Sequence, residues 1–268
     1  TIAKAVYNLI FHKFDGSSFL ANVGEISQQP DGLVHLQERL LSDILMKRRI
    51  KISNVDRGII VIKKRLHCKR VLVVLDDVSQ LNQINALVRE RAWFGVGSRI
   101  IITTRDEHLL NVLEVDETYE AKELNYNDSL QLFSWHAFRK DHPLEDYVDL
   151  SMDMVDYMGG VPLALEVLGS FLFDKRNISE WKSALEKLKR VPDNQIQEKL
   201  RISFDALDGK QKDLFLDIAC FFMGMDKDTA IRILEGCDFF SEIGLSVLIS
   251  RSLLTINENN ELRMHDLL

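Results

Sequence analysis

In the first half of the chain, short unbroken apolar runs alternate with segments whose apolar residues recur at helical spacing. The clearest unbroken runs lie within residues 71–78 and 97–104, and residues 17–23 resemble a short strand. Helical spacing is found in residues 1–11, 33–47, 55–67 and 80–88. Unbroken Val, Ile and Leu runs are typical of strands that helices cover on both faces. The pattern therefore predicts an α/β domain with a parallel sheet.

Beyond about residue 124 the strand pattern ends and helical spacing continues almost to the end of the chain. Gly-Gly-Val-Pro at residues 159–162 joins two helical segments, because glycine suits the end of one helix and proline the first turn of the next. A last helix at 244–251 precedes a hairpin pattern at 253–264, as in a winged-helix domain. We expect an α/β domain at 1–123, an all-α helical domain at 124–197 and a winged-helix domain at 198–268.

Composition narrows the class of protein. The 268 residues are 46% hydrophobic, which is ample for packed cores, and carry a formal charge of −7. This charge argues against a broad nucleic-acid-binding face but leaves a local basic patch open. Three scattered cysteines indicate neither a disulfide framework nor a metal site, and no apolar run is long enough for a bilayer. We expect a protein of the cytoplasm or nucleus, without direct binding to nucleic acid or membrane.

The strand ends carry the candidate chemistry. Asp76 and Asp77 directly follow the buried run at 71–75, and Arg105 follows the run at 97–104. Parallel α/β sheets bind ligands beyond the carboxyl ends of their strands. Asp76 could there hold a hard cation beside phosphate oxygens, as a Walker B aspartate does, and Asp77 could orient a water. Capping of the next helix explains the two carboxylates equally well, and arginine is common at strand ends.

Six short segments carry a family resemblance when they are taken in order. They are FLANV at 19–23, VLVVLDDV at 71–78, GSRIIITTRD at 97–106, GGVPLA at 159–164, FLDIACFF at 215–222 and MHDLL at 264–268. This ordered set resembles the NB-ARC region of plant disease-resistance proteins of the nucleotide-binding, leucine-rich-repeat class. The segment at 215–222, and the absence of Trp after residues 76–78, resemble the subclass with an upstream TIR domain.

The resemblance implies a P-loop-type nucleotide-binding switch of the STAND NTPase class, which is compact with ADP and opens and oligomerises with ATP. Asp76 would then serve Mg²⁺, Asp77 would serve the attacking water, and Arg105 would be the sensor arginine near the terminal phosphate. Pro162 would pack on the adenine, with its structural role at a helix start as the alternative. His265 would reach the ADP β-phosphate. Slow ATP hydrolysis, and partnership with the receptor's own TIR and leucine-rich-repeat domains, are also implied.

Two departures from the family's pattern qualify these expectations. The chain contains no Gly-rich phosphate-binding loop, and Thr1 aligns with the second Thr after that loop's Lys, so we expect a piece of a longer protein with an incomplete nucleotide site. Gly24 stands where the family often has an arginine. A degenerate NB-ARC scaffold without nucleotide cycling is the alternative function. A P-loop metabolic kinase would not account for the long helical half or the His265-Asp266 ending.

Overall fold

A computed structural model describes residues 2–47, 50–175, 177–190, 201, 204–236, 241–251 and 253–264, with only the backbone for 187–190. The chain divides into two compact units, residues 1–116 and 117–268. The division falls at the start of an extended segment, residues 117–125, that lies ahead of helix α7 (Tyr126–Phe138). The predicted boundary at residue 123 lies within this same segment.

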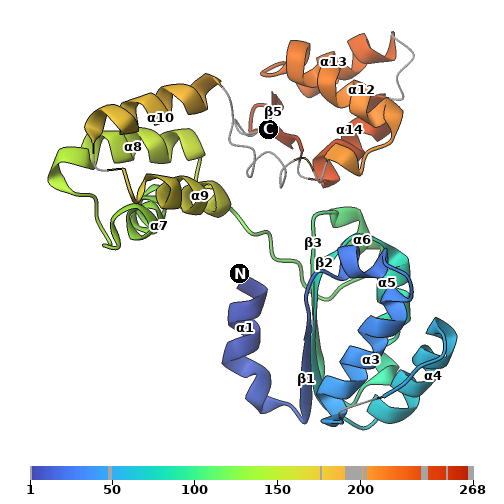
Figure 1. Cartoon of the computed structure of the whole chain (residues 1–268). Coiled ribbons are helices and arrows are strands. Elements are labelled where there is room, and N and C mark those ends of the chain that lie inside the picture. Colours follow the sequence, from blue (N-terminus) through green and yellow to red (C-terminus); the bar gives the residue numbers. More distant parts are fainter. Residues whose placement is uncertain are drawn as a thin grey trace. The chain divides into compact units, whose positions relative to one another are not determined.

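The first unit is built on three parallel strands, β1 (Gly16–Leu20), β2 (Val71–Val78) and β3 (Arg99–Thr104), with β2 in the middle. Helix α1 (Ile2–Ile10) covers one face, and helices α3 (Gly32–Leu45), α4 (Val55–Leu66) and α5 (Leu81–Leu87) cover the other (Figure 1). The register aligns Leu75 of β2 with Leu20 of β1 and Ile102 of β3. The strands therefore end at one common edge, as the sequence predicts.

Burial explains why the middle strand is so uniformly apolar. Residues 71–75 of β2 have no exposed surface, and α3 buries Leu36, Leu40 and Ile44 against the sheet. Full burial of such a side chain stabilises the fold by about 1.5–3 kcal/mol. Strand β3 is only partly buried along its length, because it lies at the edge of the sheet.

The strand predicted at residues 17–23 is shorter than expected. Strand β1 ends at Leu20, and a short helix, α2 (Val23–Ser27), begins where the strand was predicted to continue. Asn22 precedes this helix with a left-handed backbone, φ 54° and ψ 44°. Asparagine tolerates this conformation better than most residues, so it can turn the chain out of the strand. Later in the unit, a short helix α6 (Glu107–Val112) follows β3.

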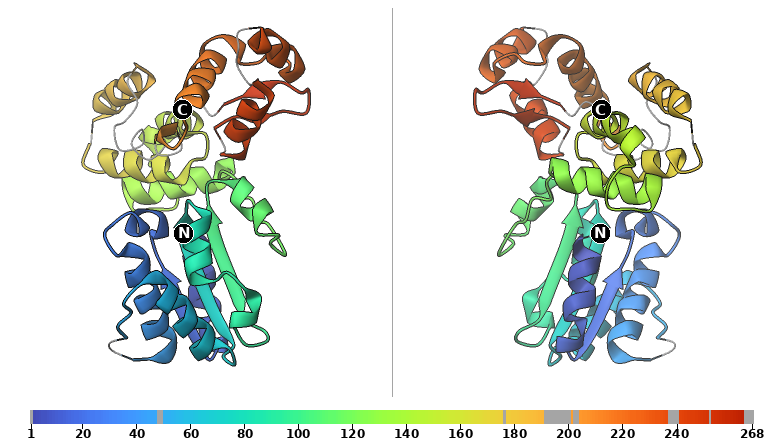
Figure 2. Two further views of the ribbon diagram at one scale, coloured as in Figure 1. Left: turned by 90° about the vertical axis from the view of Figure 1, so that its right-hand side faces the viewer. Right: turned by 90° about the vertical axis from the view of Figure 1, so that its left-hand side faces the viewer.

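The second unit begins with four helices, namely α7, α8 (Val148–Met158), α9 (Pro162–Leu172) and α10 (Ile178–Arg190) (Figure 2). They share a core in which Trp181 contacts the rings of Phe133, Phe138 and Tyr147. Gly160 has φ +75°, and a Cβ there would lie 2.4 Å from the carbonyl oxygen of Leu124. Glycine is thus required at this junction for two independent reasons.

The remaining elements form a separate apolar core. They are α12 (Gly209–Asp217), the π-helical turn η4 (Ile218–Phe222), α13 (Lys227–Glu235), α14 (Ser241–Ser250), β4 (Thr255–Ile256) and β5 (Leu262–Arg263). Strands β4 and β5 pair antiparallel, which is the hairpin predicted for a winged-helix domain. Asn260, in the hairpin turn, donates from its side chain to Asp226 (2.8 Å) and accepts from the backbone of Lys227 (2.8 Å). The turn is therefore tied to the start of α13. No helix in the described part of the chain is long and apolar enough to cross a membrane.

Candidate nucleotide site

Asp76 and Asp77 lie at the carboxyl end of β2, where the strand leaves the core. Residues 71–75 are fully buried, whereas both aspartates are partly exposed. The pairing of β2 with β3 shifts register between Leu75 and Val78, and Asp77 has a left-handed φ of +59°. Such a backbone in a non-glycine residue is uncommon and is found at turns and functional sites. The irregularity places the two consecutive carboxylates at the sheet edge.

Thr103 on β3 holds this arrangement in place. Its hydroxyl donates a hydrogen bond to Oδ1 of Asp76 (2.8 Å) and accepts one from the backbone N–H of Asp77 (2.8 Å). One side chain of the neighbouring strand thus fixes the Asp76 carboxylate and replaces a backbone partner that the register shift removes. Thr103 was not among the predicted site residues, because its contacts with Asp76 and Asp77 depend on the pairing of β2 with β3, which no local pattern of residues specifies.

Arg105 reaches the same edge from β3. Its Nε lies 3.4 Å from Oδ1 of Asp77, and the two side chains are each 45% exposed. An ion pair this exposed contributes about 0–1 kcal/mol to stability, so it orients the guanidinium more than it stabilises the fold. The structure therefore brings Asp76, Asp77 and Arg105 together. The next residue, Asp106, has a different role: its carboxylate caps α6 by accepting a hydrogen bond from the backbone N–H of His108 (3.0 Å).

A buried glutamine supports the turn after the aspartates. Gln83 of α5 accepts from the backbone N–H of Ser79 (2.9 Å) and donates to the hydroxyls of Ser27 (2.7 Å) and Ser79 (3.1 Å). On the other side, a Cβ on Gly24 would lie 2.8 Å from the carbonyl oxygen of Asp77. The backbone of Asp77 therefore packs directly on α2, which only a glycine at position 24 allows without a shift.

The donor chemistry at this edge fits Mg²⁺. Mg²⁺ usually binds one or two carboxylates and takes its other ligands from water and phosphate oxygens. Asp76 offers a partly exposed carboxylate of which Thr103 engages only Oδ1. The described residues contain no group of three or more His, Cys, Asp or Glu side chains that could form a complete protein cage. A site of this type needs the phosphates of a ligand to complete its coordination.

The other predicted site residues belong elsewhere or lie outside the described residues. Pro162 is exposed at the first position of α9, directly after the Gly159-Gly160 junction, as its structural role predicts. It belongs to the second unit, whereas Asp76 belongs to the first. Thr1 and His265 lie outside the described residues.

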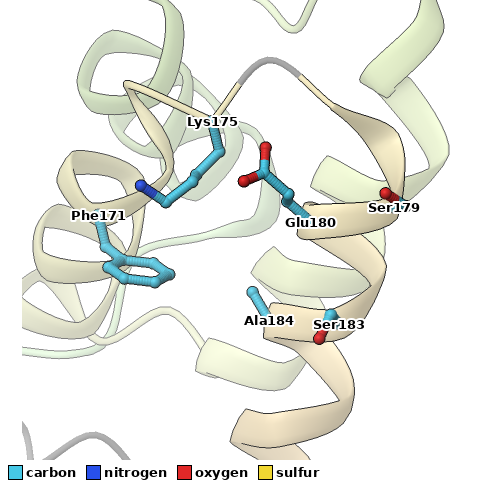
Figure 3. A pocket seen from close by; sticks show the side chains of 6 residues that line it. All are labelled: Phe171, Lys175, Ser179, Glu180, Ser183 and Ala184. Carbon is cyan, nitrogen blue, oxygen red and sulfur yellow. The ribbon is translucent and has the colours of Figure 1, made fainter.

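The helical part of the second unit has a separate hollow of about 370 Å³. Phe171 and Lys175 line one side, and residues of α10 line the other (Figure 3): Ser179, Glu180, Ser183 and Ala184. The Lys175 ammonium lies 5.5 Å from the centre of the Phe171 ring and pairs with Asp174 (2.7 Å). The charge of Lys175 is thus already paired with that of Asp174. Glu180 is the single carboxylate among the six residues that line the hollow, so the hollow lacks a pair of acidic side chains.

Comparison with known families gives two matches. The NB-ARC domain model matches residues 1–143, and the winged-helix domain model of Roq1-like disease resistance proteins matches residues 208–268. The second match covers most of the predicted winged-helix domain.

Full-length relatives match across the whole chain. Disease resistance protein RUN1 of Vitis rotundifolia is 45% identical over 269 residues, and TMV resistance protein N of Nicotiana glutinosa is 42% identical over 275 residues. Disease resistance protein RRS1B of Arabidopsis thaliana is 36% identical over 268 residues. The chain spans 20% of RUN1 and 23% of the N protein, about a fifth of their length. The family predicted from the six motifs is confirmed, and the chain belongs to the NB-ARC family of nucleotide-binding domains.

Proposed function

We propose that the chain is the ADP/ATP-binding switch of a plant immune receptor acting in defence, with slow ATP hydrolysis in the complete receptor. The observation that carries the proposal is the meeting of Asp76, Asp77 and Arg105 at the carboxyl edge of a parallel sheet. The membership of the NB-ARC family supports adenine nucleotide as the ligand. The names of the relatives, all disease resistance proteins, support the role in defence.

Each residue has a distinct proposed role at this edge. Asp76 would hold Mg²⁺, which would supply positive charge beside the phosphates. Asp77 accepts a hydrogen bond from the attacking water, and its left-handed backbone places its carboxylate beside Asp76. Arg105 pairs with Asp77 in the structure and turns to the terminal phosphate when that group is present, because a phosphate offers its guanidinium stronger paired hydrogen bonds.

The roles of the remaining residues follow from the family alone. We propose that Pro162 packs on the adenine, that His265 contacts the ADP β-phosphate, and that Thr1 borders the phosphate loop. We also propose the three domains at 1–123, 124–197 and 198–268, which three separate apolar cores support. TIR and leucine-rich-repeat domains of the receptor are the proposed partners, with a homo-oligomer on activation. The proposed location is the cytoplasm or the nucleus.

The deciding experiment removes the negative charge of Asp76 and compares this variant with a matched control variant at Asp106. In a chain extended with the family's Gly-rich loop and its strand, Asp76→Asn keeps an oxygen that accepts from Thr103 but loses the carboxylate. Asp106→Asn makes the same change at a helix start, where asparagine caps as well as aspartate. We expect Asp76→Asn to weaken Mg²⁺–ATP binding at least about tenfold while ADP binding without metal changes little.

Isothermal titration and ATP turnover give the readout. Asp106→Asn should change either quantity by no more than about twofold. Equal effects of the two variants would remove Asp76 from the metal site. An extended chain that binds no nucleotide at all would favour the scaffold without nucleotide cycling.

A further inference from the structure

The opposite, amino edge of the sheet carries a dense set of cations. Segments before the three strands and after α3 and α4 meet at this edge (Figure 1). We call the following set the basic edge: Lys13, Lys47, Lys64, Arg65, Lys69, Arg70 and Arg99. All but Lys69 are exposed. No ion pair joins Lys13, Lys64 or Arg65 to a carboxylate among the residues that the structure describes.

Backbone contacts fix the segments of the basic edge to one another. Lys69 accepts at its carbonyl from the backbone N–H of Gly95 (2.8 Å), and the carbonyl of Arg70 accepts from the N–H of Asp15 (2.8 Å). The guanidinium of Arg70 also donates to the carbonyl of Lys13. At the end of α3, a Cβ on Gly16 would lie 2.7 Å from Ile44, so the start of β1 packs directly on that helix. The cations are therefore carried on one connected surface.

The basic edge has little negative charge to offset it. Asp15 is the one acidic residue in the segments 13–16, 45–47, 63–71 and 95–99, and its carboxylate accepts from the backbone N–H of Arg70 (2.9 Å). The two units also differ in charge. Residues 1–116 contain 17 Lys and Arg against 13 Asp and Glu, a charge of +4, whereas residues 117–268 contain 17 against 28, a charge of −11. The overall charge of −7 thus conceals a basic first unit.

Two aliphatic side chains protrude from the same edge. Met46, directly after α3, is 90% exposed, and Val96, in the loop before β3, is fully exposed. Neither is aromatic, so neither offers the flat ring on which a nucleic-acid base stacks. Cations around protruding aliphatic side chains are instead the combination that binds the boundary between lipid headgroups and acyl chains.

Against the expectation drawn from the overall charge, we propose that the basic edge binds a membrane surface that contains anionic lipids. Clusters of four to eight Lys or Arg side chains beside a membrane anchor or on an amphipathic helix bind anionic lipids, and the basic edge presents seven cations. Met46 and Val96 enter the headgroup region. The nucleotide edge lies at the other end of the same strands, so a membrane bound at the basic edge does not cover it. This proposal does not depend on the proposed nucleotide switch.

The test is flotation of the 268-residue chain with phosphatidylcholine vesicles that contain about 30% phosphatidylserine, at about 0.1 M salt. The chain should bind these vesicles and dissociate from them at high salt. It should not bind vesicles of phosphatidylcholine alone. The triple change Lys13→Gln, Lys64→Gln and Arg65→Gln should weaken binding at least about tenfold. Met46→Ser with Val96→Ser should weaken it about three- to tenfold without changing its salt dependence.

The matched control removes three exposed lysines of the second unit, through Lys122→Gln, Lys140→Gln and Lys182→Gln. It should bind vesicles nearly as well as the parent chain, because the three lysines lie outside the basic edge and the added negative charge of the second unit is partly screened at about 0.1 M salt. Circular dichroism checks that each variant is folded. The proposal is overturned if the control variant loses as much binding as the basic-edge variant, or if vesicle binding does not depend on the presence of phosphatidylserine. Tighter binding to duplex RNA than to the vesicles would also overturn it.

Discussion

Arg105 and Asp77 form an ion pair at the carboxyl edge of the sheet, with 3.4 Å between Nε and Oδ1 and with both side chains 45% exposed. Water reaches both partners, so the pair contributes about 0–1 kcal/mol to stability. We expect Arg105→Ala to change the free energy of unfolding by less than about 1 kcal/mol. Urea unfolding of the 268-residue chain measures this. A loss of several kcal/mol would show that Arg105 is a structural residue and would weaken its proposed role at the phosphate.

Thr103 should matter more to the fold than Arg105 does. Thr103→Val removes the hydroxyl that serves both Asp76 and the N–H of Asp77 while keeping the shape of the side chain. Both aspartates are partly exposed, so each of the two lost hydrogen bonds should cost about 0.5–1.5 kcal/mol, which is about 1–3 kcal/mol in total. Urea unfolding should show a loss in this range for Thr103→Val. Thr103→Ser keeps the hydroxyl and should recover more than half of the loss; equal losses for the two variants would indicate packing of the methyl group instead.

Gly24 should be intolerant of any side chain. A Cβ at this position would lie 2.8 Å from the carbonyl oxygen of Asp77, so Gly24→Ala forces the backbone beside the site to move. Overpacking of this kind costs about 1–3 kcal/mol. Gly209 is a matched control, because it begins α12 and has nothing within 4 Å of its Cβ position. Gly209→Ala should be neutral or stabilise the chain by up to about 1 kcal/mol, as thermal or urea unfolding will measure.

The sequence predicts the position of the site better than its detail. Asp76 and Arg105 could be placed at one edge because parallel strands end together and an unbroken apolar run marks a buried strand. The left-handed backbone of Asp77 could not be predicted, because it depends on the register shift between β2 and β3. The role of Thr103 depends on the same shift. Both features are tertiary, and no local pattern of residues specifies them.

Elsewhere, local chemistry decided how well an element was predicted. Pro162 starts α9 because its fixed φ suits the first turn of a helix, which the sequence already showed. Helix α2 was missed because Ala21 and Val23 on either side of Asn22 extend the strand pattern, whereas Asn22 turns the chain there through a left-handed conformation. The hairpin β4–β5 was predicted from its polar turn, but the attachment of Asn260 to α13 is a contact distant in sequence. Such contacts could not be predicted from the spacing of apolar and polar residues along the sequence.

The hairpin turn should also be sensitive to acid. The amide of Asn260, and then the backbone and hydroxyl of Thr229, hold the pKa of Asp226 below its usual value. Asn257, followed by Arg263, similarly holds the pKa of Glu261 below its usual value. A lowered pKa means that the folded state favours the carboxylate, so this stability is present above the unfolded-state pKa values, near 4, and is lost as pH falls through the folded values.

The readout is backbone hydrogen exchange at Lys227, whose N–H donates to the carbonyl of Asn260. Protection of this amide should hold at neutral pH and fall below about pH 4. Asn260→Gly keeps the positive φ of 63° accessible but removes the amide that bonds Asp226. The variant should raise the pKa of Asp226 in an NMR titration. An unchanged pKa would mean that Asn260 does not stabilise the charged form.

The 268-residue chain by itself should hold ADP only weakly. It contains no Gly-rich loop ending in Lys and Thr, and that loop's backbone N–H groups and Lys make most of the phosphate contacts in P-loop proteins. Without two or three charge-assisted hydrogen bonds of about 1.5–3 kcal/mol each, affinity should fall more than about a hundredfold. Asp76 cannot compensate, because a metal held there needs an anchored phosphate to bridge.

Isothermal titration of ADP into this chain, beside the chain extended with the family's Gly-rich loop and strand, measures the difference. The added strand should also improve stability, because β3 lies at the edge of the sheet and is only partly buried. Arg105 follows β3, so the extension should order the side of the site on which that arginine lies. Comparable ADP affinities in the two chains would mean that ADP does not depend on the loop beside the carboxyl edge, and that the proposed site is misplaced.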